Sequence, residues 1–362
     1  MSLKHLIKSI LLAYMLLTYS SVAIAEVNPE QWLKLNQAVI NDHVLPNYLK
    51  LAKQSAELKT SSTQLCQAPN SVTLEQTQTS FINMLNAWQR IQHVQFGPIE
   101  LLMRSYTIQF WPDKKNLTSK QLNLLLTEAN PATLAPEFFN TASIAVKGLP
   151  AIERIIFTDE PLKTLQENPF HCQFLQAISG HLLTQTENTL AEWQTYKQEF
   201  EYLSSEEGNY ESAQEASIDL MKAQVEPLEI IRDLKILRPL GKTAKAKPRR
   251  LENWRSKNAL QNMQHNIQAL HHMYSGVTAY NLSLLMREQG EVGLADDIET
   301  QFKSIETGLS KLPSPLSKHL QEASVHKQLL HISEQISQLH SNLEKSMNML
   351  ELQLGFNSRD GD

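Results

Sequence analysis

Apolar residues recur at every third or fourth position along most of the chain. Trp32, Leu35 and Val39 follow this spacing near the start, and Phe81 and Met84 begin a second such run. This spacing places apolar side chains on one face of a helix, whereas the alternation at every second position that is typical of strands is not sustained. The pattern therefore predicts an all-α protein.

Breaks in the periodicity divide the chain into segments. We expect loops at 60–73, 111–119 and 239–250, and short helices at 121–128 and 136–146. Longer helices are predicted over 162–203, with a break at Asn168-Pro169, and over 211–236, 251–288, 296–310 and 316–353. The polar, acidic stretch 204–209 is the predicted domain boundary. The sequence therefore predicts two helical bundles, at 26–205 and 209–355.

Residues 1–25 have the layout of a signal peptide. Lys4 and Lys8 precede an apolar core at 10–17, and Ala23-Ile24-Ala25 has the small-x-small pattern of a cleavage site. An uncleaved anchor helix is the alternative, but the apolar core is short for a hydrocarbon layer of about 30 Å. No cysteine lies near the expected cut, which argues against lipid attachment there. No later run reaches 18 apolar residues, so we expect a periplasmic protein without a transmembrane segment.

Charge and cysteine content narrow the classes of function. Asp and Glu number 38 against 33 Lys and Arg, which gives a formal net charge of −5. A nucleic-acid-binding protein would show a basic excess, so we expect no nucleic acid partner. The two cysteines, Cys66 and Cys172, lie outside any C-x-x-C pair, and a redox enzyme is not indicated. In an oxidising compartment they form either one disulfide or two separately buried thiols.

A first group of candidate site residues follows Trp88. If one helix continues through this stretch, His93, Glu100 and Arg104 fall on a single polar stripe. Gly97-Pro98 would kink that helix and expose a backbone carbonyl. The stretch is interpreted either as a kinked helix that lines a polar site or as a surface Glu100–Arg104 pair beside a packing kink.

Two further stretches place carboxylates near helix starts. Trp111 and Pro112 precede Asp113, which is either a loop ligand or a helix cap. Gly148 and Pro150 precede Glu153, whose neighbours are isoleucines, so this carboxylate is expected to be buried. A buried carboxylate needs a proton, a metal or a cation, for which Arg104 and Arg255 are candidates.

The fourth stretch follows the basic loop and is expected to open the long helix at 251–288. It contains Glu252, Trp254, Arg255 and Ser256. Arginine and tryptophan together are typical anchors for anions or interfaces, and a solvated basic turn is the alternative. No phosphate loop, H-E-x-x-H motif or nucleophile elbow occurs in the chain.

Together, these stretches and the segment His171-Cys172-Gln173-Phe174-Leu175-Gln176-Ala177 resemble the imelysin family, exported helical proteins also called insulin-cleaving membrane peptidase-like. The resemblance covers most of the chain after residue 25. It implies a two-domain all-α fold built from four-helix bundles, a periplasmic or surface location in a bacterium, and a link to iron uptake or iron-regulated expression. It also supports a Cys66–Cys172 disulfide.

One departure from the family's pattern affects the expected chemistry. The family's G-x-H-x-x-E motif, associated with a metal site, reads Gly148-Leu149-Pro150-Ala151-Ile152-Glu153 here, so a proline stands where the histidine should be. A catalytic zinc ion usually needs three protein ligands and an open position. The sequence therefore favours a non-catalytic binding protein, and the alternatives are a metallopeptidase and a structural or partner-binding module.

The predicted binding site lies between the two bundles. Glu153 and His93 are the expected metal ligands, and the cofactor would be iron or another divalent or trivalent metal. The expected partners are a metal or a small anionic or chelated ligand, and a periplasmic or inner-membrane iron-uptake protein. The residues assigned to the site are His93, Glu100, Arg104, Trp111, Asp113, Gly148, Pro150, Glu153, Glu252, Trp254, Arg255 and Ser256.

Overall fold

The computed structural model describes residues 26–202, 208–241, 245–277 and 279–352. The predicted signal peptide at 1–25 and most of the predicted boundary at 204–209 lie outside these residues. Over the described ranges the chain forms helices and turns without a strand, which confirms the all-α prediction. Nowhere in those ranges is a helix both long and apolar enough to span a membrane.

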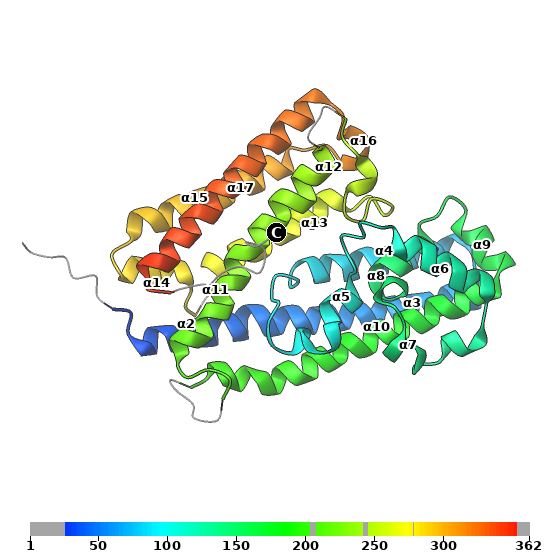
Figure 1. The fold of residues 1–362 in the computed structure, drawn as a ribbon, viewed down its shortest axis with the longest axis horizontal. Helices are drawn as coiled ribbons and strands as arrows, with labels where there is room; N and C mark the ends of the chain where they lie inside the picture. The colour runs from blue at the N-terminus through cyan, green and yellow to red at the C-terminus, as the bar shows by residue number, and fades with distance from the viewer. Residues whose placement is uncertain (1–25, 203–207, 242–244, 278, 353–362) are drawn as a thin grey trace, which may run out of the picture.

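Three long helices form the core of the first bundle (Figure 1). Helix α3 (Leu45–Gln67) packs between α4 (Ser71–Gln89) and α10 (Pro169–Tyr196). Helix α8 (Gly148–Ile156) covers α4 and α10 and is buried over eight of its nine residues. Shorter helices surround this core: α5 (Arg104–Ile108), α6 (Leu117–Glu128), α7 (Phe138–Thr141) and α9 (Pro161–Glu167).

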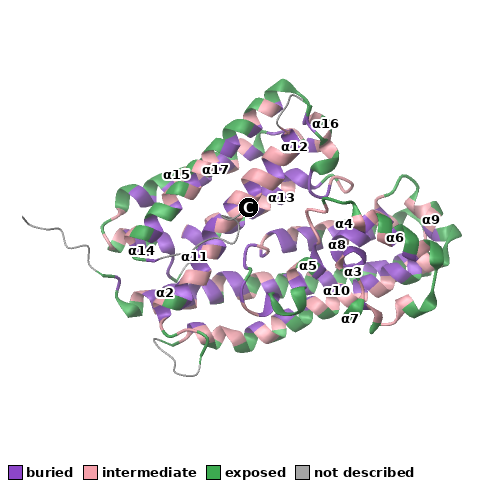
Figure 2. Ribbon diagram, in the orientation of Figure 1, coloured by how far each residue is buried: buried purple, intermediate pink, exposed green. Residues whose placement is uncertain are grey.

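The second bundle consists of four longer helices and three short ones (Figure 1). Helix α17 (Ala323–Met349) packs on α11 (Ala213–Glu229) and on α15 (Val292–Ser310), and α13 (Ala259–His271) packs on α15. The short helices are α12 (Arg238–Leu240), α14 (Leu282–Glu288) and α16 (Leu316–His319). The apolar faces of both bundles point inward, as the buried positions in Figure 2 show.

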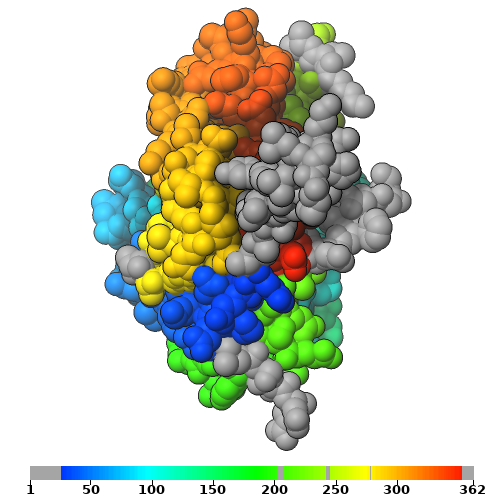
Figure 3. Space-filling model, turned by 90° about the vertical axis from the view of Figure 1, so that its left-hand side faces the viewer, coloured from blue at the N-terminus to red at the C-terminus, as the bar shows by residue number. Residues whose placement is uncertain are grey.

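The first described helix connects the two bundles. Helix α2 (Pro29–Val39) begins at an Asn28 capping box and packs on α11 and α14 of the second bundle. It continues through a π-helical turn, η1 (Ile40–Val44), into α3 of the first bundle. Figure 3 shows this end of the molecule, where the blue surface of the N-terminal helix adjoins the yellow and green surfaces of the second bundle. The continuous helix formed by α2, η1 and α3, which we call the helical rod, therefore belongs to both bundles.

A disulfide joins Cys66 at the end of α3 to Cys172 in the first turns of α10. This confirms the disulfide and excludes the alternative of two separate thiols. The bond ties two helices that are far apart in the sequence, because the two cysteines are 106 positions apart.

The predicted loop at 60–73 is much shorter, because α3 continues to Gln67 and α4 begins at Ser71. The serines and threonines that suggested a loop bond to carbonyls of their own helix, as Thr63 Oγ1 does to the Lys59 carbonyl at 3.0 Å. Ser62 is fully buried and its Oγ lies 3.2 Å from Ser179 Oγ on α10. Small hydroxyl side chains here allow α3 and α10 to pack closely.

Three π-helical turns lie within or at the end of longer helices in the described residues: η1, η7 (Ile230–Leu237) and η9 (His272–Gly276). Such turns are rare and are frequent at functional sites. They carry His43, Lys235 and His272, and each of these side chains contacts a residue on a different segment of the chain. The π-helical turns thus supply polar groups to the contact between the two bundles.

Candidate functional site

A cavity of about 570 Å³ lies between the two bundles. Its first wall comes from residues 88–112 of the first bundle, and its second wall comes from α11, η7 and α13. Aromatic side chains, Trp88, Phe96, Tyr106 and Trp111, form part of the first wall. On the second wall, α11 presents Asp219, Lys222, Ala223, Glu226 and Pro227 at helical spacing. We call this cavity the cleft.

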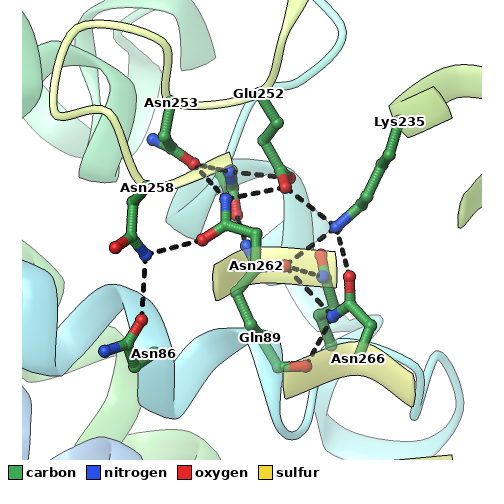
Figure 4. A network of polar contacts seen from close by, with 10 residues as sticks. Asn86, Gln89, Lys235, Glu252, Asn253, Asn258, Asn262 and Asn266 are labelled. Carbon is green, nitrogen blue, oxygen red and sulfur yellow. Dashed lines mark hydrogen bonds and ion pairs between the residues drawn. The ribbon is translucent and has the colours of Figure 1, made fainter. Parts of the chain in front are cut away.

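A buried ion pair lies where the cleft meets the bundle contact (Figure 4). Lys235 Nζ is 2.9 Å from Glu252 Oε2, and each side chain is only 3% exposed. The Lys235 ammonium also donates to Gln89 Oε1 at 2.8 Å and to Asn266 Oδ1 at 2.6 Å. Burial lowers the pKa of Lys235, and the negative charge of Glu252 opposes this shift. The ammonium is therefore held by one charge and two amides.

Amide side chains extend this network across the bundle contact. Asn262 Nδ2 and Gln109 Nε2 donate to the two oxygens of Glu252, at 2.8 and 3.1 Å. Asn258 Nδ2 lies between Asn262 Oδ1 and Asn86 Oδ1, at 2.8 and 2.9 Å (Figure 4). We call the ion pair and these amides the polar network. Its hydrogen bonds fix the geometry with which the first bundle meets α13.

The sequence reasoning missed most of this polar network. Asn258, the residue before α13, and Asn262 and Asn266 within it recur every fourth position, so the latter two share one face of the helix. Amide side chains repeated on the apolar face of a helix could have indicated a buried polar contact from the sequence. Lys235 gave no such signal, because the π-helical turn η7 determines the direction of its side chain.

Glu153 is buried at the contact between the bundles, as predicted from its apolar neighbours. Its side chain accepts two hydrogen bonds from Ser256, from the backbone N at 3.0 Å and from Oγ at 2.6 Å, and the residue is 3% exposed. Burial raises the pKa of Glu153, and the Ser256 hydrogen bonds and the charges of Arg154 and Arg255 oppose this shift. The carboxylate thus joins α8 to the second bundle through a serine.

The segment 252–256 does not open a long helix, which corrects the prediction. Asn253 and Lys257 adopt left-handed backbone angles, with φ of 48° and 62°, so the helix begins only at Ala259. Two cations lie near the Trp254 ring, since the guanidinium carbons of Arg255 and Arg249 are 4.3 and 5.7 Å from its centre. Glu252 and Ser256 of this segment bond to Gln109 and Glu153 of the first bundle, whereas the expected anchoring role of Trp254 and Arg255 stays a prediction.

The predicted polar stripe through His93, Glu100 and Arg104 is wrong, because no helix continues through it. Helix α4 ends at Gln89, and residues 97–103 form two short 3₁₀ turns in which Leu102 and Met103 are left-handed. Gly97 also has a positive φ of 68°, and a Cβ there would lie 2.6 Å from the Tyr196 ring. This close approach and Pro98 prevent a regular helix.

Arg104 and Glu100 do not pair with each other. Arg104 is buried, forms a two-pronged ion pair with Glu192 of α10, and donates to the Pro98 carbonyl at 2.9 Å. Glu100 is exposed and lines the cleft, where partial burial and the nearby charge of Asp219 raise its pKa. Arg104 therefore fixes the turns beside the cleft, and Glu100 faces a carboxylate of the other bundle.

Asp113 caps a helix, as one of the two interpretations expected. Its two oxygens accept the backbone N–H groups of Leu117 and Thr118, at 2.8 and 2.9 Å, at the start of α6. Arg154 lies 4.0 Å from the same carboxylate. Trp111 does line the cleft, with Lys235 Nζ 5.9 Å from its ring centre.

Gly148 and Pro150 position α8 and do not line the cleft. Gly148 has a φ of 64°, and a Cβ there would lie 2.2 Å from the Thr107 carbonyl oxygen and 2.3 Å from that of Ile108. Only glycine permits this approach. Pro150 is buried in the first turn of α8, and its carbonyl accepts Arg154 Nη1 at 2.7 Å.

His93 and Glu153, the two expected metal ligands, have different protein partners. His93 Nε2 lies 2.9 Å from His43 Nε2, whereas Glu153 is bonded to Ser256. Across the described ranges, no three His, Cys, Asp or Glu side chains are grouped so that they could hold a metal ion. The donor set therefore does not fit a bare metal ion with three protein ligands.

The cleft brings together four of the predicted site residues, His93, Glu100, Trp111 and Glu252. Arg104, Asp113, Gly148, Pro150, Glu153, Trp254, Arg255 and Ser256 are not among the residues that line it. The lining residues that sequence reasoning missed include Asp219, Lys222, Glu226 and Lys235. Some of the predicted site residues thus line the cleft, and the others lie in the structure around it.

Comparisons with known proteins agree with this architecture. The family model described as Imelysin (Peptidase M75) matches residues 44–343. A protein named "Iron-regulated protein A" from Synechococcus elongatus is 23% identical over 279 residues, which cover 74% of this chain and 72% of that protein. The structure of an imelysin-like protein from Psychrobacter arcticum matches with a TM-score of 0.72 at 21% identity, covering 91% of this chain and 99% of the other. A structure from Parabacteroides distasonis matches with a TM-score of 0.77 at 13% identity, covering 90% and 96%.

Proposed function

The chain belongs to the imelysin family, and from this we propose that it is an exported, iron-linked binding protein without catalytic activity, whose ligand occupies the cleft between the two bundles. Two facts support the link to iron and the type of site. A relative is named as iron-regulated, and the cleft volume of about 570 Å³ lies in the range of small-molecule sites.

The chemistry of the cleft indicates the charge of its ligand, and this is the observation that carries the proposal. Four carboxylates, Glu100, Asp219, Glu226 and Glu252, and two ammonium groups, Lys222 and Lys235, line it. Four acids less two bases leave a formal excess of two negative charges. Together with the aromatic wall, this excess favours a small cation that also has apolar or planar surface.

A metal complex suits this cleft better than a bare ion does. A chelated metal ion brings its own donor atoms, so the protein has to match only the charge and shape of the complex. This requirement agrees with the absence of a three-ligand group in the described part of the chain. The same absence, together with Pro150 at the motif position, removes support from the alternative of a zinc peptidase.

Glu100 and Asp219 are the residues most directly placed to sense a cation. They come from different bundles, and the charge of Asp219 helps to raise the pKa of Glu100. A cation between them would relieve this repulsion and would favour the ionised form of both groups. Binding would therefore draw the two walls of the cleft together, and it would weaken as Glu100 becomes protonated at low pH.

Export is part of the same proposal. The predicted signal peptide at 1–25 and the Cys66–Cys172 disulfide both suit an oxidising compartment, and we place the mature protein in the periplasm. Cell fractionation with mass determination tests this point. The expected mature chain begins at Glu26, and a periplasmic fraction lacking the protein would refute the location.

The binding proposal is tested by thermal shift and calorimetry with defined probes. These are the iron(III) complex of desferrioxamine B, which carries a net positive charge, iron(III) citrate, which is anionic, metal-free desferrioxamine B, and iron(II), iron(III) and zinc salts. We expect the cationic complex to raise the melting temperature, because a ligand that binds only the native state stabilises it. Absence of any binder, or a preference for the anionic complex, would refute the proposed cleft chemistry.

Variants of the cleft carboxylates locate the binding. The double variant Glu100→Gln/Asp219→Asn should bind the cationic complex about tenfold or more weakly, which corresponds to roughly 1.4 kcal/mol or more. Glu334→Gln, at a side chain that is 74% exposed on α17, is the matched control and should bind like the parent protein. Equal affinity in the double variant would place the ligand elsewhere.

A further inference from the structure

Three histidines from different segments form a continuous chain across the contact between the bundles. His93 follows α4 in the first bundle, His43 lies on η1 in the rod shared by both bundles, and His272 begins η9 in the second bundle. The two Nε2 atoms of His93 and His43 are 2.9 Å apart, and the two Nδ1 atoms of His43 and His272 are 3.0 Å apart. His43 thus uses both of its ring nitrogens.

The chain of histidines connects two cavities. His93 lines the cleft. His43 and His272 line a second cavity of about 650 Å³, which we call the second pocket. His43 and His93 are buried, at 1% and 5% exposure, whereas His272 is exposed. The chain therefore has a solvent-facing end at His272 and a buried end beside the cleft at His93.

The nitrogen–nitrogen distances indicate shared protons and are shorter than those expected for two imidazoles on one metal ion. Two imidazoles that bind one zinc ion at about 2.0–2.1 Å in tetrahedral geometry have their nitrogens roughly 3.3 Å apart. Separations of 2.9 and 3.0 Å are those of N–H···N hydrogen bonds. Each of the two contacts therefore holds one proton.

Counting protons shows that the chain of three neutral rings has two states. Three neutral imidazoles carry three N–H groups, two of which occupy the two contacts. The third lies either on His93 Nδ1 or on His272 Nε2, depending on the direction in which the hydrogen bonds run. Within the described residues His93 Nδ1 is buried without a hydrogen-bond partner. A buried nitrogen of this kind calls for a group from the cleft, such as water or ligand.

The surroundings keep all three rings neutral. Burial lowers the pKa of His93 to about 3 and that of His43 well below its usual value, and neighbouring His93 and His272 add to the shift of His43. Burial also lowers the pKa of His272, where the charge of Asp42 opposes the shift and that of Arg90 adds to it. The other titratable groups that line the second pocket are His271, Glu299 and Glu306, and His271 also lowers the pKa of His272. The charged groups that line the cleft are Glu100, Asp219, Lys222, Glu226, Lys235 and Glu252.

We propose that His272, His43 and His93 form a proton relay between the second pocket and the cleft. A proton from water binds His272 Nε2, and the proton on His272 Nδ1 passes to His43 Nδ1. The proton on His43 Nε2 then passes to His93 Nε2, and His93 Nδ1 releases its proton toward the cleft. One proton enters and one leaves, every ring stays neutral afterwards, and reorientation of the rings resets the chain.

The relay gives protons a path between the cleft and solvent that does not pass through the opening of the cleft. A ligand that gains or loses a proton on binding could exchange it through the second pocket while the cleft is filled. The inference rests on the histidine geometry, so it does not depend on the identity of the ligand and would survive failure of the proposed metal-complex binding. In this proposal the π-helical turns η1 and η9 position two of the three histidine rings, His43 and His272.

Nuclear magnetic resonance of protein with ¹⁵N-labelled histidine tests the relay directly. We expect scalar couplings across both N–H···N contacts, and we expect the buried proton between His43 and His93 to exchange with solvent. In His272→Gln, which keeps a hydrogen-bonding side chain but cannot pass a proton through a ring, this exchange should slow by tenfold or more. His331→Gln, at a histidine on α17 whose side chain is 68% exposed, is the matched control and should leave the rate unchanged.

Three results would overturn the proposal. Exchange in His272→Gln at the parent rate would mean that the buried proton reaches solvent by another path. Absence of either coupling would mean that the rings do not share protons. Displacement of the shared protons by one equivalent of zinc or copper would make the histidines a metal site. His272→Phe provides a second block of the outer end, and slowed exchange in both variants would support the relay.

Discussion

Replacing Lys235 by methionine tests the energetic role of the polar network. Methionine keeps the unbranched shape of the side chain and removes its charge. In the parent protein the ammonium contacts Glu252 at 2.9 Å and donates to Gln89 and Asn266. The variant leaves the carboxylate of Glu252 with only its neutral amide donors in a site that is 3% exposed. We therefore expect a large loss of stability.

The size of the loss follows from what remains buried. Removal of one partner of a buried ion pair typically costs about 3–5 kcal/mol, because the other charge is left uncompensated. Lys235→Met should lower the free energy of unfolding by about this amount. The double variant Lys235→Met/Glu252→Gln removes both charges and should recover about 2 kcal/mol or more relative to the sum of the single variants. Lys303→Met, at a side chain that is 64% exposed, should change stability by less than about 1 kcal/mol.

Urea unfolding measures these differences, provided that fluorescence and circular dichroism give coincident transitions, which a single free energy of unfolding requires. A loss of less than about 1 kcal/mol for Lys235→Met would refute the reasoning. It would mean that water reaches Glu252 through the cleft and that the ion pair is solvated. Additive effects in the double variant would show that the two charges do not interact.

Four further predictions concern the scaffold. Gly148→Ala should destabilise the protein severely or prevent folding, because its Cβ would overlap two backbone carbonyls, and expression with circular dichroism checks this. Glu153→Ala should cost about 2–3 kcal/mol, whereas Glu153→Gln, which retains an acceptor and whose parent carboxylate has a raised pKa, should cost less than about 1 kcal/mol in urea unfolding. Cys66→Ser/Cys172→Ser should cost about 2–4 kcal/mol by the same assay. Burial holds the pKa of His93 at about 3, below the value of about 6.5 in the unfolded chain. The neutral ring therefore contributes its full share of the free energy of unfolding above pH 6.5, and this share is lost at roughly 1.4 kcal/mol per pH unit between pH 6.5 and 3. His93→Gln should reduce the pH dependence of the free energy of unfolding in this range by about one proton.

Periodicity predicts the fold well because it reports directly on which face of a helix is buried. The all-α class and the burial of Glu153 both follow from the sequence. Hydrophobic periodicity fails where a helix contains a run of polar residues. Ser62 and Thr63 suggested a loop, but their hydroxyls bond within the helix or pack on α10.

The site was predicted less completely, because its residues converge through tertiary structure. The sequence predicts a kinked helix between His93 and Arg104, whereas Gly97 and the left-handed Leu102 turn the chain there and no helix continues. Lys235 lines the cleft from the π-helical turn η7. Helical periodicity assumes 3.6 residues per turn, so a π-helical turn changes the expected direction of every side chain that follows it.

The polar contact between the bundles explains why a cleft exists. Two apolar faces would pack until the space between them was filled, because apolar burial has no preferred direction. The polar network instead requires fixed hydrogen-bond distances, and an amide or ammonium that loses its partner in this position is costly. It holds α13 and η7 against Gln89 and Gln109 at a set spacing, and the cavity of about 570 Å³ lies beside it. The unusual features of the fold, π-helical turns, left-handed residues and buried charges, thus converge at one contact, and the physical requirements of that contact define both the cleft and the histidine chain that enters it.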